Sequence, residues 1–317
     1  MTEPTSIHPA TSVGHVHLTV ADLPRLLHFY RDVLGFRDAW TDGEDTVFLS
    51  SDGRYPFHFG LTRASAPRPS RRTAGLYHMA FLFPDRRALG RSFLRLETLG
   101  VPVDGTADHL VSEAIYLRDP EGNGIELYAD RPQDEWARLD GQIRMTTEPL
   151  DLESLREAAD ETEPWTGIAP GARLGHVHLR VSDLGRTEDF YHGVLGFDVT
   201  TRAYPGALFL SAGGYHHHLG VNIWGGTGLA PLPPGSPGLR YFTVTLPDKQ
   251  ELVRIVRRAE KYEARIEGAA DHGLYEAVTL RDGDGISVVL TVDRVPGRVH
   301  PRVWKSEPIE VGAVLQG

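Results

Sequence analysis

The stretch GHVHLTVADLPRLLHFYRDVLGF occupies residues 14–36, and a close copy, GHVHLRVSDLGRTEDFYHGVLGF, occupies residues 175–197. Further on, the Asp-His pair at residues 108–109 returns at residues 271–272. Self-similarity at a fixed spacing indicates one structural unit written twice. The chain therefore consists of two related halves, and the fold is argued from this repeat.

Each half also repeats weakly within itself. HVHLTVADL, beginning at His15, resembles HMAFLFPDR, beginning at His78. In the second half, His176 and Tyr241 hold the equivalent places. Each copy has an apolar or alternating run, then Asp, then a stretch with helical periodicity. We therefore expect four modules, each containing a strand, a helix and further strands.

Local signals agree with this module. Asp22 and Asp183 are good N-caps, because a short side-chain acceptor binds free amides of the first helical turn. Gly35 and Gly196 stand where a glycine would end the helix. Apolar residues between cap and glycine recur at helical spacing. Short strand candidates follow at residues 47–49, 57–61, 114–117 and 125–128. The predicted fold class is α+β.

The repeat also predicts the domain organisation. We expect an N-terminal tail over residues 1–12, and then a first domain over 13–131 and a second over 173–293. Residues 132–172 should form a linker with a short helix near 152–159, and residues 294–317 a tail packed on the surface or on a partner.

Composition narrows the function classes. The 317 residues include 33 basic and 43 acidic ones, and a net charge of −10 makes nucleic acid an unsuitable partner. The absence of cysteine excludes disulfides, thiolate metal sites and cysteine nucleophiles. No apolar run approaches the length of about 20 residues that spans a bilayer, and the first residues do not resemble a secretory signal. A cytoplasmic protein is expected, and a homo-oligomer is compatible with the sequence.

Histidines linked by the repeat are candidates for chemistry. His15 and His17 point to the same face of a strand, and the half-repeat selects His15, because His15 aligns with His78. Glu126 is an acid in an otherwise apolar strand, where a carboxylate is costly unless it is paired or bound to a metal. Two histidines and a carboxylate form the facial triad that leaves open positions on a divalent metal, typically Fe(II) in oxygenases. The alternative is that Glu126 faces solvent at a strand edge.

These motifs, with GLYHMAFLFPD at residues 75–85 and DHLVSEAIYLRDPEGNGIELYADRP at residues 108–132, resemble the two-domain catechol 2,3-dioxygenase-type proteins. That group is the extradiol, ring-cleaving branch of the vicinal-oxygen-chelate superfamily. The resemblance covers residues 13–293 and implies tandem domains. Each would be built of two βαβββ modules that form a curved, partly open mixed sheet with helices outside. It implies metal ligands at His15, His78 and Glu126.

The resemblance also implies roles beyond the ligands. Tyr116, upstream of the glutamate, matches a tyrosine that bonds a substrate oxygen; its alternative is a half-buried strand aromatic. His58 is expected to be the acid/base group, work suited to histidine near neutral pH. His109 resembles a histidine of the same loop in these enzymes, although its twin His272 favours a structural role. The strand at residues 57–61 has no carboxylate, which tilts away from glyoxalase chemistry.

The second half departs from the triad. His176 is kept, but Tyr241 stands where His78 was, and Ser287 is aligned with Glu126. This half carries the run His216, His217 and His218, and an acid/base histidine lies on a strand like this one in the extradiol enzymes. His176, His217 and His218 are therefore second candidates for metal binding. The run is either a structural or interface feature, or part of a second site.

The sequence favours an Fe(II)-dependent extradiol dioxygenase that acts on a catechol-like aromatic with dioxygen. The alternatives are a lyase or isomerase of the superfamily using Zn, Ni or Mn, and a non-catalytic module that binds an apolar or aromatic ligand. The modules could pair within one chain or swap between chains. In either arrangement, pairing of consecutive modules would bring His15 and His78 together.

Overall fold

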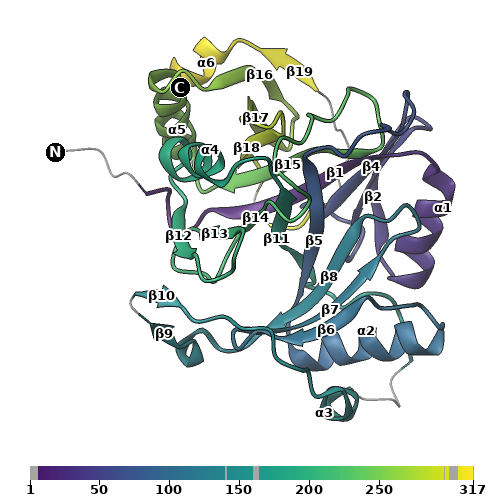
Figure 1. Ribbon diagram of the computed structural model, residues 1–317. Helices are drawn as coiled ribbons and strands as arrows, with labels where there is room; N and C mark the ends of the chain where they lie inside the picture. Colours follow the sequence, from purple (N-terminus) through teal and green to yellow (C-terminus); the bar gives the residue numbers. More distant parts are fainter. Residues whose placement is uncertain (1–5, 140, 160–163, 296, 300–305, 317) are drawn as a thin grey trace.

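The computed structural model describes residues 6–139, 141–159, 164–295, 297–299 and 306–316. Two large curved sheets form the molecule, and helices lie outside them (Figure 1). Parallel and antiparallel pairs occur in both sheets. The expected α+β fold of curved mixed sheets is therefore confirmed. No helix among the described residues is long and apolar enough to cross a membrane.

The first sheet, called here the β1–β15 sheet, has nine strands in the order β19-β16-β17-β18-β15-β1-β4-β3-β2. Its strands are β1 (Ser12–Val20), β2 (Arg37–Asp42), β3 (Thr46–Ser50), β4 (Phe59–Arg63), β15 (Gly238–Leu246), β16 (Arg265–Asp271), β17 (Tyr275–Arg281), β18 (Ser287–Asp293) and β19 (Glu307–Ile309).

The second sheet, called the β5–β11 sheet, has eight strands in the order β12-β13-β14-β11-β5-β8-β7-β6. Its strands are β5 (Gly75–Phe83), β6 (Gly105–Asp108), β7 (Ser112–Arg118), β8 (Gly124–Asp130), β11 (Arg173–Arg180), β12 (Asp198–Thr201), β13 (Ala207–Ser211) and β14 (Leu219–Asn222). A small separate pair joins β9 (Arg138–Leu139) to β10 (Gln142–Ile143).

The pairing of modules differs from the expected one. The first module pairs with the fourth, because β1 lies antiparallel to β15, and the second pairs with the third, because β5 lies antiparallel to β11. Each sheet therefore combines strands from both sequence halves. The expected pairing of the first module with the second was wrong, since the first strands of all four modules present similar edges and local patterns do not rank their partners.

The helices follow the sequence signals. The side chains of Asp22 and Asp183 accept hydrogen bonds from the first turns of α1 and α4, at 3.1 and 2.8 Å, as N-caps do. The helices are α1 (Leu23–His28) with a π-helical continuation (Phe29–Val33), α2 (Arg86–Thr98), α3 (Leu152–Ala158), α4 (Leu184–Glu188) with a π-helical continuation (Asp189–Val194), α5 (Lys249–Lys261), α6 (Val311–Gln316) and a short 3-10 turn (Gln133–Glu135).

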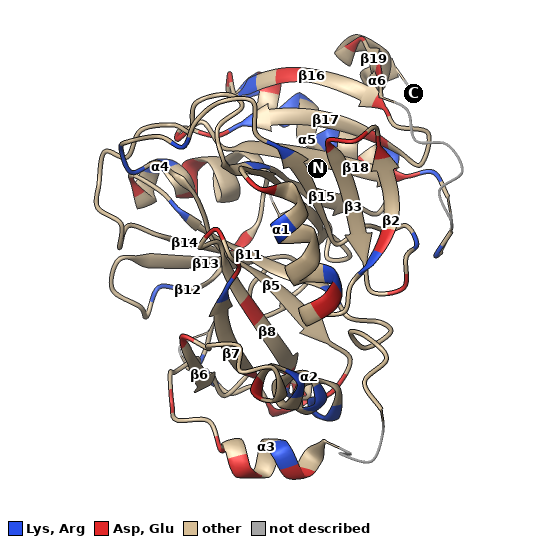
Figure 2. Cartoon of the chain, turned by 90° about the vertical axis from the view of Figure 1, so that its right-hand side faces the viewer, with Lys and Arg blue, Asp and Glu red and all other residues tan. Residues whose placement is uncertain are grey.

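Basic and acidic residues both occur along α2 and α3, which lie on the outside of the molecule (Figure 2). The apolar core lies under the helices, with Tyr30, Phe59 and Phe81 among its fully buried residues. The C-terminal segment adds β19 to the edge of the β1–β15 sheet, and α6 packs on α5, with Val314 buried. Residues 300–305 of the expected C-terminal tail lie outside the described residues.

Candidate active site

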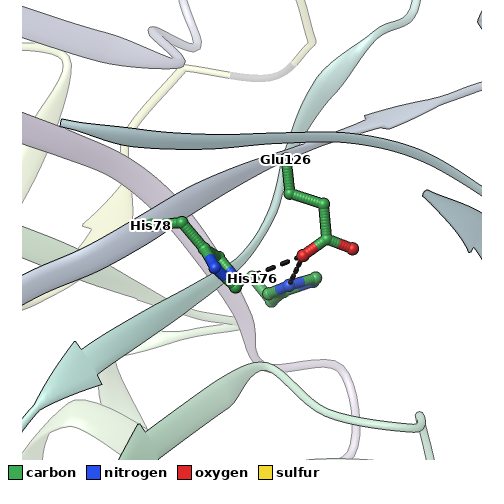
Figure 3. Close-up of side chains that lie close together, drawn as sticks. All are labelled: His78, Glu126 and His176. Atoms are coloured by element: carbon green, nitrogen blue, oxygen red, sulfur yellow. Dashed lines mark hydrogen bonds and ion pairs between the residues drawn. The ribbon is translucent and has the colours of Figure 1, made fainter. Parts of the chain in front are cut away.

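Three ionisable side chains from three strands converge in the β5–β11 sheet (Figure 3). His78 lies on β5, Glu126 on β8 and His176 on β11. Oε2 of Glu126 lies 3.0 Å from Nε2 of His78 and 3.1 Å from Nε2 of His176. One ligand atom of each residue lies within 4.8 Å of the others, and the residues are only 7%, 3% and 1% exposed. Water is therefore largely excluded from this cluster.

Strand register explains the convergence. Ala80 of β5 pairs with His176 on one side and with Glu126 on the other. The small, fully buried alanine leaves room for both long side chains to meet above it. His78 is two residues away on the same strand and so points to the same face. Because β11 and β8 flank β5, His176 and Glu126 reach His78 from opposite sides of its strand.

The electrostatics favour an ionised carboxylate at the centre of the cluster. Burial by itself would raise the pKa of Glu126, but the neighbouring His176 and His78 hold it well below its ordinary value. Burial lowers the pKa of His176, although Glu126 opposes this shift. A carboxylate together with two imidazole nitrogens is a suitable ligand set for a divalent cation.

The hydrogen bonding within the cluster also fits an ion. His78 Nε2 is buried and, despite its closeness to Glu126, makes no well-directed hydrogen bond to any described residue. Buried polar atoms normally have a hydrogen-bond partner, so an unsatisfied one needs an explanation. A metal ion provides that explanation, because a nitrogen that binds a metal uses its lone pair for the ion and needs no hydrogen-bond partner. The residues present therefore fit a bound cation.

A cavity of about 330 Å³ opens beside the cluster. His78 and Glu126 form part of its wall, and aromatic side chains form much of the rest. The aromatic and apolar lining includes Tyr77, Met145, Tyr204, Phe209 and Trp224. Such a hollow, with a few polar groups at one end, suits a small apolar ring that carries oxygen substituents.

Tyr116 points into this cavity from β7. Its hydroxyl lies 2.7 Å from Nε2 of His109, and Nδ1 of His109 lies 2.6 Å from the carbonyl oxygen of Thr146. A carbonyl only accepts, so Nδ1 of His109 donates to Thr146, and Nε2 of a neutral ring then accepts from Tyr116. The hydroxyl oxygen therefore keeps lone pairs free. Burial and the nearby Glu126 raise the pKa of Tyr116 well above its ordinary value.

His217 also lines the cavity. Its ring centroid lies 4.1 Å from that of His176 and 4.9 Å from that of Phe209. Burial lowers the pKa of His217 well below its ordinary value, which keeps the ring neutral. A neutral imidazole beside the His78–Glu126–His176 cluster is placed to exchange a proton with a ligand in the cavity.

Two first-choice residues lie elsewhere. His15 is on β1 of the other sheet, where its ring packs edge-on against Phe48 and its Nε2 lies 3.4 Å from the hydroxyl of Tyr241. His58 lies beside Ser51, with 3.2 Å between Nε2 and Oγ, and is not part of the cavity wall. The structure does not bring His15 to His78 and Glu126, because β1 pairs with β15 rather than with β5.

The second candidates also separate. His176 joins His78 and Glu126, and His217 lines the cavity, but His218 turns away and its Nδ1 accepts the backbone N–H of Ala212 at 3.1 Å. The three histidines lie in the loop just before β14, so each can take a different environment. His58 is the equivalent of His218, because the carbonyl oxygen of each accepts a hydrogen bond from the first strand of its module, at Val16 and Val177.

The structure also corrects the alignment of Glu126 in the second half. Asp119 and Asp282 are equivalent, because each accepts a hydrogen bond from the buried helix tyrosine of the module it packs on, Tyr30 or Tyr191. Seven residues after Asp282 comes Val289, so Val289 rather than Ser287 occupies the place of Glu126. The β1–β15 sheet therefore has His15, Tyr241 and Val289 where the β5–β11 sheet has His176, His78 and Glu126.

Comparisons with known proteins agree with this geometry. A family model for the Glyoxalase/Bleomycin resistance protein/Dioxygenase superfamily matches residues 12–127 and 173–290. A catechol-2,3-dioxygenase of Bacillus subtilis (strain 168) is 45% identical over 261 residues, which cover 81% of this chain and 90% of that protein. A manganese-dependent 2,3-dihydroxybiphenyl 1,2-dioxygenase of Geobacillus genomosp. 3 is 22% identical over 284 residues, covering 84% of this chain and 79% of that one.

The crystal structure of glyoxalase I from Zea mays superposes with a TM-score of 0.54 at 18% sequence identity. It covers 89% of this chain and 92% of that one, which shows a common fold. The extradiol dioxygenase class expected from the motifs is confirmed by the relatives. The chain belongs to the Glyoxalase/Bleomycin resistance protein/Dioxygenase superfamily.

Proposed function

We propose that this chain is an Fe(II)-dependent extradiol dioxygenase that cleaves the ring of a small catechol-like aromatic. The observation that carries the proposal is the convergence of His78, Glu126 and His176 at the wall of an aromatic-lined cavity. The similarity to a catechol-2,3-dioxygenase over most of the chain supports the substrate class. The metal ligands would be these three residues, with His176 in place of His15.

A divalent metal on two histidines and one carboxylate keeps open coordination positions, and it supplies the redox chemistry by which dioxygen reacts with a catechol. The protein residues bind and orient the substrate. The aromatic wall holds the ring by apolar contact and excludes water. The free lone pairs of the Tyr116 hydroxyl accept a hydrogen bond from a substrate hydroxyl, which orients the ring.

His217 would act as the acid/base group in place of His58. Its neutral ring faces the cavity and can take the proton that a catechol hydroxyl releases on binding. The same nitrogen can return the proton later in the reaction. His58 cannot take this role, because it lies beside Ser51 and does not line the cavity.

The test is anaerobic reconstitution of the purified protein with Fe(II), followed by a panel of catechols and air. We expect about one metal per chain, dioxygen uptake and a yellow ring-fission product. Parallel reconstitution with Mn(II), Zn(II) and Ni(II) identifies the active metal. Turnover without dioxygen would instead indicate a lyase or isomerase, and failure to bind any metal would refute the site itself.

A further inference from the structure

The histidine run contains a hydrogen-bonded chain that ends at the cavity. Oδ1 of Asp130 lies 2.8 Å from Nε2 of His216. Nδ1 of His216 lies 2.8 Å from Nδ1 of His217, the residue that lines the cavity. His216 is completely buried, and its ring packs against Tyr215 and Trp136. The chain therefore runs through the interior from the end of β8 to the cavity.

The donors and acceptors in this chain can be assigned in only one way when both rings are neutral. A carboxylate only accepts, so His216 donates from Nε2 and its Nδ1 has no proton. That nitrogen must then accept, so His217 donates from Nδ1. The remaining ring nitrogen of His217, Nε2, is left unprotonated. No residue in the described part of the chain bonds to this Nε2, so it is free to accept from a ligand.

We infer that Asp130 and His216 are positioning residues, which hold the His217 ring in one orientation and in the tautomer that leaves Nε2 as its acceptor. The inference rests on the acid/base role proposed above for His217. A histidine held by a second group in one tautomer and one orientation avoids the loss of rate that comes from a wrong tautomer or a loose ring.

The β1–β15 sheet provides an internal comparison. There, Tyr55 bonds to Asp293, which is equivalent to the bond of 2.9 Å between Tyr215 and Asp130. This tyrosine–aspartate pair is thus common to both sheets and belongs to the scaffold. The two histidines are not: Pro56 and Phe57 stand at their places in the sheet that lacks the carboxylate ligand. The histidine chain accompanies only the complete cluster.

The first test is a comparison of His216→Phe with Tyr215→Phe in the Fe(II)-loaded enzyme. His216→Phe keeps a ring in the packing but removes both nitrogens, and we expect kcat to fall about 10- to 100-fold, as for other supporting residues of metal sites. KM should change less than about threefold, and metal content should stay the same. Tyr215→Phe removes the hydrogen bonds of the tyrosine hydroxyl to Asp130 and Tyr128 but leaves the Asp130–His216–His217 chain, and its kcat should stay within about twofold of the wild type.

The second test does not depend on turnover. Nitrogen-15 NMR of the histidine rings in Zn(II)-loaded protein should show His217 protonated at Nδ1 and bare at Nε2, and this pattern should be lost in His216→Phe. A protonated Nε2 in the wild type, a wild-type kcat in His216→Phe, or equal losses in the two variants would each overturn the inference. If His217→Ala still cleaves catechols, the proposed role of His217 fails, whereas the NMR result stands.

Discussion

Nε2 of His176 lies 3.1 Å from Oε2 of Glu126, although the two residues come from opposite halves of the sequence repeat. The contact exists because β11 and β8 flank the same strand, β5. The candidate metal site therefore depends on both halves of the chain. An isolated first half would retain His78 and Glu126 but would lack the third side chain.

Removing His176 should abolish tight metal binding. The expected result for His176→Ala is a metal content at least about tenfold below that of the wild type, because a buried carboxylate and one imidazole remain. Metal bound after anaerobic reconstitution and removal of the excess, measured by elemental analysis, checks this. His15→Ala is the matched control: it removes the equivalent residue of the other sheet and should leave metal content unchanged. The reverse pattern would restore His15 as the ligand.

The repeat, the helix caps and the strands follow from local patterns, and these could be predicted. The placement of His78 beside Glu126 was also predictable, because neighbouring strands of one module hold both. The partner of β5 was not. Each of the four first strands is apolar and alternating, so the free energies of the possible pairings depend on side-chain packing across the whole sheet.

One signal for His176 was present in the sequence. The repeat keeps a histidine at both positions 15 and 176. The other two ligand-type residues, His78 and Glu126, both lie in the second module. If the second module pairs with the third, His176 completes the set just as well as His15 does in the other pairing. His217 was harder to choose, since it lies in the loop before β14 among three consecutive histidines, and no periodic pattern says which of them faces the cavity.

Loss of the Tyr116 hydroxyl should reduce the stabilisation of the transition state without changing metal binding. Tyr116→Phe removes one hydrogen bond to the substrate, so kcat/KM should fall about tenfold, corresponding to about 1.4 kcal/mol. Steady-state kinetics with catechol measure it. Thr279 is the equivalent residue in the β1–β15 sheet, and Thr279→Val should leave kcat/KM unchanged. A Tyr116→Phe enzyme as active as the wild type would show that the hydroxyl only supports His109.

Protonation of buried His15 should contribute to acid unfolding. Burial lowers the pKa of His15 from 6.5 to about 3, since the ring would have to leave water as a cation. The folded state thus favours the neutral ring, and this contribution is complete above pH 6.5 and decreases as the pH falls towards 3. His15→Phe should therefore reduce the slope of the unfolding free energy against pH by up to about 1.4 kcal/mol per unit.

Urea unfolding at several pH values between 4 and 7 tests this prediction. His58 and His218 also have lowered pKa values, of about 4 and 3, so the variant should keep part of the pH dependence. Ring-cleaving activity at pH 7 should remain, because His15 packs in the other sheet. An unchanged slope would mean that His15 binds protons equally in the folded and unfolded chains over this range, contrary to its lowered pKa.

A methyl group at Gly124 should disturb the site through the backbone. A Cβ there would lie 2.2 Å from the carbonyl oxygen of Tyr77 and 2.9 Å from Cβ of His78, so β8 would have to move away from β5. Overpacking of this kind costs about 1–3 kcal/mol. Gly124→Ala should therefore lower both the unfolding free energy and the metal affinity, because the shift separates Glu126 from His78.

Gly105→Ala is the control for Gly124→Ala, since a Cβ at Gly105 of the same sheet would meet no atom within 4 Å. Its unfolding free energy should stay within about 0.5 kcal/mol of the wild type. Urea unfolding and a metal titration on both variants separate the two effects. If the close approach of β8 to β5 is the reason that residue 124 is a glycine, Gly124→Ala loses metal affinity and Gly105→Ala does not. Equal affinities would show that the strands can separate at this point without moving the ligands.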